Sequence, residues 1–129
     1  MNTMSIALAP ARATASVAGA RENTRHFLHD LLPVVAAEAA DAVVLVVSEL
    51  VTNALRHGAG ICVLDLTEHP DGVEVAVHDD SPRPPQMRAP DLIGGAGGFG
   101  WPMVNHLARA TSITPRPTGG KTVSALLAR

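Results

Sequence analysis

Aromatic residues are nearly absent from this chain, which has two phenylalanines, one tryptophan and no tyrosine among 129 residues. Its interior must therefore be filled by valine, leucine, alanine and isoleucine. The hydrophobic fraction of 47% is ordinary for a globular protein, and the length suffices for a real core in one domain. We expect residues 1–129 to form a single domain with an aliphatic core.

Three further absences narrow the class of protein. Cys62 is the single cysteine, so the chain forms no internal disulfide and fits a reducing cytoplasm. The longest apolar run, Ala42–Val47, is far too short to span a bilayer. The first 15 residues lack a basic region ahead of an apolar segment, so no signal peptide is expected. We expect a cytoplasmic protein with no membrane partner.

Acidic residues are missing from the end of the chain. All twelve lie at or before Asp91, together with six of the ten basic residues, which gives this part a charge of −6. Residues 92–129 carry four basic residues and no acid, a charge of +4. A cationic, glycine-rich end suits a polyanionic small ligand such as a nucleotide, although chance asymmetry in a short chain would look the same. The basic residues are too sparse for duplex DNA.

Helical apolar spacing predicts two helices in the first half of the chain. The first runs over residues 16–32 and is stopped by Pro33. The second runs over residues 35–57 and ends at a glycine-rich segment, 58–60. Residues 1–14 are expected to be a loose N-terminus.

The second half predicts strands. Residues 61–67 and 73–77 form a hairpin, a short helix covers 101–108, and two last strands cover 111–114 and 122–127. This order predicts an α+β fold, a two-layer sandwich in which helices cover one face of a mixed, mostly antiparallel sheet.

A long loop is expected between the two halves. Four prolines and four glycines fall within residues 81–98, and no regular element survives that composition. A loop of this length in a small domain is usually functional, and we expect residues 83–97 to form a lid.

The most informative segment is 48–57 (SELVTNALRH) on the second helix. Glu49 and Asn53 lie four residues apart and project about 40° from each other on one helix face. A solvated polar stripe is the plainer interpretation. A carboxylate beside a neutral amide oxygen can also bind a hard cation and deprotonate a nucleophile.

Two other features point to a ligand. Asp79 follows an apolar strand, where it can accept hydrogen bonds from a ligand amino group or start a turn. The glycine-rich segment that leads into the helix at Trp101 offers free backbone N–H groups to phosphates, or is a plain linker.

Two familiar nucleotide motifs do not apply. Residues 95–100 satisfy G-x-G-x-x-G, but a proline-rich loop precedes them and no acid follows Asp91, which excludes a Rossmann site. Residues 120–122 (GKT) end like a Walker A loop, but the earlier glycine that the loop requires is replaced by Pro115.

Taken in order, four blocks resemble the GHKL (histidine-kinase-like) ATPase superfamily. Residues 49–54 (ELVTNA) look like its N box, 77–85 (VHDDSPRPP) like its G1 box, 98–104 (GFGWPMV) like its G2 box, and 119–125 (GGKTVSA) like its closing block. The chain is most similar to the single-domain branch of anti-sigma factor serine kinases, from about residue 14 onward.

The resemblance implies a role for each matching residue. Asn53 would coordinate Mg²⁺ on the ATP phosphates, and Glu49 would be the general base. Asp79 would bind the adenine amino group, with Thr122 supporting the same end of the pocket. The last implied contact, from the backbone of Gly98 and Gly100 to the phosphates, agrees with the physics of phosphoryl transfer, which needs positioning and charge neutralisation.

Three functions follow from the resemblance. In the first, the chain is a serine/threonine kinase that phosphorylates a STAS-type anti-anti-sigma protein and controls a sigma factor, with a homodimer also expected. In the second, it is a non-catalytic, ATP-gated protein-binding module. Phe99 favours the second, because this position often carries a basic residue. A histidine-kinase catalytic domain ranks third, since only about 30 residues precede Pro33.

Overall fold

The computed structural model describes residues 1–57, 60–81 and 100–129. In chain order, the described elements are β1 (Thr3–Leu8), a 3-10 turn (Pro10–Arg12), α1 (Ala13–His29), α2 (Ala37–His57), β2 (Cys62–His69), β3 (Gly72–Asp79), α3 (Gly100–Leu107), β4 (Ala110–Pro115) and β5 (Lys121–Ala128). The predicted lid, residues 83–97, lies outside the described residues, as do Gly98 and Phe99.

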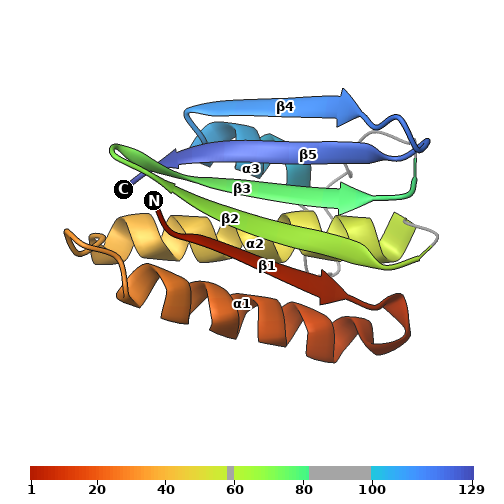
Figure 1. The fold of residues 1–129 in the computed structure, drawn as a ribbon, viewed down its shortest axis with the longest axis horizontal. Coiled ribbons are helices and arrows are strands. Elements are labelled where there is room, and N and C mark those ends of the chain that lie inside the picture. Colours follow the sequence, from red (N-terminus) through yellow and green to blue (C-terminus); the bar gives the residue numbers. More distant parts are fainter. Residues whose placement is uncertain (58–59, 82–99) are drawn as a thin grey trace, which may run out of the picture.

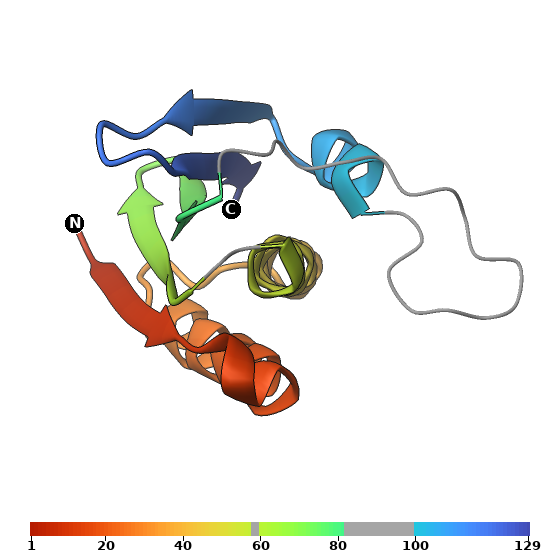
Figure 2. The same cartoon turned by 90° about the vertical axis from the view of Figure 1, so that its right-hand side faces the viewer.

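The described strands form one sheet in the order β1-β2-β3-β5-β4. Each neighbouring pair of strands is antiparallel. The long helices α1 and α2 lie side by side on one face of this sheet, and α3 lies next to α2 (Figures 1 and 2). The predicted α+β sandwich is confirmed, and the sheet that was expected to be mixed is antiparallel throughout its described part.

The strands form because apolar residues recur at every second position. On β3, Val73, Val75 and Val77 are buried, while the residues between them are half-buried. Successive side chains of a strand point to opposite faces, so the valines face the helices. The same alternation along β2 and β5 gives the sheet one apolar and one polar face.

The core lies between this apolar face and the helices. Its buried residues are mainly valine, leucine and alanine, and none is aromatic, which confirms the predicted aliphatic core. Helix α2 contributes Val43, Val47, Leu50 and Ala54 at helical spacing. Burial of this stripe fixes the rotation of α2 and hence the direction of its polar residues.

The N-terminus differs from the prediction. Thr3–Leu8, expected to be loose, forms the edge strand β1 and pairs with β2, Ile6 opposite Leu64. The physical reason is the alternation of Met4, Ile6 and Leu8 with small polar or alanine residues, which matches the pleat of a half-buried strand.

Truncation of a core leucine should test the packing. Leu66 is fully buried. We expect Leu66→Ala to lower the free energy of unfolding by about 2–5 kcal/mol, through lost burial and the cavity left behind. Leu32 is 79% exposed and provides the matched control. Leu32→Ala should change the free energy of unfolding by less than about 0.5 kcal/mol in urea titrations followed by circular dichroism. Equal effects of the two substitutions would contradict this core.

Candidate functional site

Glu49 and Asn53 both lie on α2 and are both half-buried. The start of α3 lies close to the first of them, since a Cβ placed on Gly100 would be 3.9 Å from Glu49 Oε2. Gly100 is itself buried and is the first residue of α3. The N-terminal end of a helix carries unpaired N–H groups and a partial positive charge. Glu49 therefore lies beside a backbone surface suited to anionic groups.

Asn53 has an unusual side chain. Its Nδ2 is buried, and no hydrogen-bond partner for it is present in the described part of the chain. Buried polar atoms in native proteins are nearly always paired, so this amide invites a ligand. A half-turn of the amide exchanges its oxygen and nitrogen, and an amide oxygen is a ligand type that Mg²⁺ accepts. The residue present thus fits the expected metal.

A second group of side chains gathers at the end of β3. Asp79 is 2% exposed. Its Oδ1 accepts hydrogen bonds from the backbone N–H of Ser81 at 2.8 Å and from Lys121 Nζ at 3.0 Å. Lys121 Nζ also donates to the carbonyl oxygen of Ser81 at 3.1 Å. Asp79 and Lys121 are register partners on β3 and β5 and form a buried ion pair.

A glycine allows this close arrangement. A Cβ at Gly120 would overlap the backbone carbonyl of Asp79, so only glycine lets the start of β5 approach β3 here. Cys62, the first residue of β2, is also fully buried. Burial, and secondarily the charge of Asp79, raises the pKa of the Cys62 thiol to about 11. The thiol is therefore neutral at physiological pH.

The two groups share one end of the sandwich. α2 and β3 run in the same direction, so the C-terminal half of α2 and the C-terminal end of β3 lie at the same end of the sheet (Figure 1). One group offers an amide, a carboxylate and a helix N-terminus. The other offers a buried carboxylate with a cation. Such a division suits a ligand that has phosphates at one end and a polar ring at the other.

A family model described as a histidine kinase-like ATPase domain matches residues 11–126, about nine-tenths of the chain. The chain belongs to this family. Membership indicates ATP binding. None of the curated proteins compared with the chain matches it significantly.

Two of the predicted contacts of this ATPase domain need comment. Thr122 is not brought to Asp79, because its Oγ1 lies 2.7 Å from His78 Nδ1 on the opposite, polar face of the sheet. Its neighbour Lys121, which the sequence analysis missed, occupies the Asp79 side instead. Gly98 lies outside the described residues. Strand parity could have indicated Lys121, since Val123, Ala125 and Leu127 already mark the inward positions of β5.

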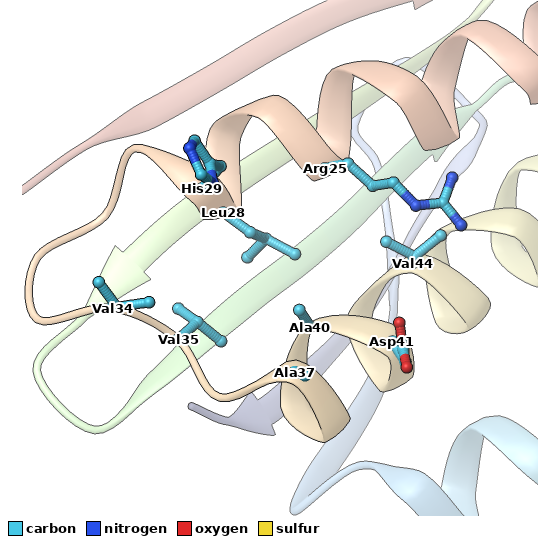
Figure 3. Close-up of a pocket in the computed structure, with 9 residues that line it drawn as sticks. All are labelled: Arg25, Leu28, His29, Val34, Val35, Ala37, Ala40, Asp41 and Val44. Carbon is cyan, nitrogen blue, oxygen red and sulfur yellow. The ribbon is translucent and has the colours of Figure 1, made fainter.

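The described surface of the ATPase domain also has hollows away from these residues. One of about 240 Å³ lies between α1 and α2, with Leu28 and Val35 at its base and Arg25 and Asp41 at its rim (Figure 3). None of the predicted site residues lines it. Within the described ranges, no three His, Cys, Asp or Glu side chains form a metal cluster, and no helix is long and apolar enough to cross a membrane.

The thiol beside Asp79 gives a pH test of this geometry. The pKa of Cys62 is raised in the folded protein from an ordinary value of 9.0 to about 11. An unfolded chain then loses this proton before the folded one does, so the contribution is complete below pH 9 and is lost as the pH rises toward 11. We expect the free energy of unfolding to fall more steeply over this range in the wild type than in Cys62→Ala. Parallel curves for the two proteins would contradict a thiol buried beside a carboxylate.

Proposed function

We propose that the chain is a Mg²⁺- and ATP-dependent regulator of the anti-sigma factor type. It phosphorylates a serine or threonine of a STAS-type anti-anti-sigma protein and thereby controls a sigma factor. The observation that carries this proposal is the position of Glu49, whose carboxylate lies beside Gly100 at the start of α3. A pure binding module has no need of a carboxylate at the phosphate end of its ligand.

ATP would lie across the end of the sandwich. In this proposal, Asp79 accepts a hydrogen bond from the adenine amino group, which buries a donor against a buried acceptor. The phosphates then lie toward the N-terminus of α3, where N–H groups and the helix dipole favour anions. Gly98, which the sequence also predicts to contact the phosphates, lies outside the described residues.

Asn53 is the residue proposed to hold Mg²⁺. Its half-buried amide, with one buried atom unpaired among the described residues, supports this assignment. When bound, Mg²⁺ supplies positive charge to the phosphates during transfer. Asn53 is neutral and lies one helical turn from Glu49, so it orients the cation without competing for the proton of the acceptor.

Glu49 is proposed as the general base. The acceptor hydroxyl of the partner protein loses its proton to the Glu49 carboxylate as its oxygen forms a bond to the γ-phosphorus. The bond between the γ-phosphorus and the bridging oxygen breaks, and ADP leaves with that electron pair. Positive charge at the α3 N-terminus stabilises the equatorial oxygens meanwhile. The products are ADP and a phosphoserine or phosphothreonine.

An ATP-gated binding module without catalysis is the second candidate. Phe99 favours it, because a neutral side chain stands directly before Gly100, where a cation would assist transfer. In this case ATP would only order a protein-binding surface, and Glu49 would have no chemical role.

Substitution of Glu49 separates the two candidates. We expect Glu49→Gln to slow phosphate transfer by about 10²–10⁴-fold, because the base is lost. ATP affinity should change little. The matched control is Glu38→Gln, an exposed residue in the first turn of the same helix, which should leave transfer unchanged. Transfer is measured with γ-labelled ATP and purified STAS-domain proteins from the source organism, and affinity by calorimetry.

Two results would count against the kinase. Transfer at the wild-type rate in Glu49→Gln would show that the assigned base is wrong. ATP binding without transfer to any STAS-domain protein, in wild type and variant alike, would favour the binding module.

A further inference from the structure

Lys121 is buried and is the single lysine of the chain. The other nine basic residues are arginines. Its side chain is 8% exposed and that of Asp79 is 3% exposed. A buried charge is costly unless paired, and the pair here is close, with Lys121 Nζ 3.0 Å from Asp79 Oδ1. The plain interpretation is that Lys121 only neutralises Asp79. The hydrogen bonds that the pair makes indicate a further role for Lys121.

An ammonium group has three hydrogens to donate. Lys121 uses two of them, one for Asp79 Oδ1 and one for the carbonyl oxygen of Ser81. Both hydrogen bonds to the Asp79 carboxylate fall on Oδ1. Among the described residues, the third hydrogen of Lys121 and Oδ2 of Asp79 have no partner. The buried pair therefore retains one unused donor and one unused acceptor.

Adenine has the complementary edge. Its exocyclic amino group is a donor, and the adjacent ring nitrogen N1 is an acceptor. Guanine has the opposite order at these two positions, an oxygen acceptor beside an N–H donor. A carboxylate alone would satisfy only the amino group of adenine and leave N1 without a donor. A carboxylate with a neighbouring ammonium satisfies both.

We propose that Lys121 is a base-recognition residue that donates a hydrogen bond to N1 of adenine, while Asp79 Oδ2 accepts one from the amino group. The inference rests on the proposed ATP site and adds to it the residue that selects adenine. Gly120 takes part indirectly, since its lack of a side chain lets Lys121 pair with Asp79. Neutral Cys62 adds no charge to this end of the site.

The direct test replaces N1 itself. Calorimetry compares ATP with 1-deaza-ATP, in which N1 is a C–H group, and with 7-deaza-ATP, which carries the same change on another edge of the ring. We expect the wild type to bind 1-deaza-ATP about tenfold to a hundredfold more weakly than ATP, the loss typical of a hydrogen bond to a charged donor. 7-Deaza-ATP should bind within about threefold of ATP, because no contact of this pair is lost.

Lys121→Met keeps the apolar stem and removes the ammonium. The readout is the ratio of the ATP and 1-deaza-ATP affinities, which a merely structural role of Lys121 would not change. We expect the ratio to fall to within about threefold in this variant, since the donor is gone. The matched control is Arg116→Met, which removes a charge from the connection before β5 and should keep the wild-type ratio.

Each other outcome overturns the inference. Equal binding of ATP and 1-deaza-ATP by the wild type removes the N1 contact but leaves the ATP site in place. A wild-type ratio in Lys121→Met assigns the contact to another donor. No ATP binding at all removes the proposed function together with the inference. If Lys121→Met does not fold, the nitrogen NMR resonance of N1 in isotope-labelled ATP decides, because it moves on accepting a hydrogen bond, and an unmoved resonance overturns the proposal.

Discussion

The packing of α2 against the central strands is the interaction on which the rest of the structure depends. Its buried stripe, which includes Val47 and Leu50, lies against the valines of β3, and none of the buried core residues is aromatic. Small aliphatic residues pack closely, so the helix has one favourable rotation. That rotation directs Glu49 toward the start of α3 and leaves Asn53 with a buried amide nitrogen. The site is thus a consequence of how the core is filled.

The alternation of side chains along the strands places the residues in the other half of the proposed site. The apolar alternation that holds β3 and β5 against the helices also decides which of their polar residues turn inward. Asp79 and Lys121 both point inward and form a buried ion pair. His78 and Thr122 point outward and form a hydrogen bond with each other. Gly120 makes the approach of the two strands feasible. The proposed base end therefore depends on sheet register, just as the proposed phosphate end depends on helix packing.

Periodicity was enough to predict most of the fold. The apolar spacing of α2 and the alternation in β3 are strong local signals, and both elements end within two residues of their expected bounds. β1 was missed because its alternation is short and mixed with alanine, so it becomes stable only through pairing with β2. Lys121 and Thr122 show a different limit. Motif matching does not distinguish neighbouring residues, yet one step along a strand moves a side chain to the other face.

In the proposed ATP site, Asp79 lies at the base end. Calorimetric titration of ATP into the wild type, Asp79→Ala and Asp80→Ala tests this placement of Asp79. Asp80 is the exposed neighbour and offers a matched control. We expect the wild type and Asp80→Ala to bind alike, and a folded Asp79→Ala to bind about a hundredfold or more weakly, because the buried acceptor is lost. Equal binding by all three proteins, or no binding by the folded wild type, would contradict an ATP site at Asp79.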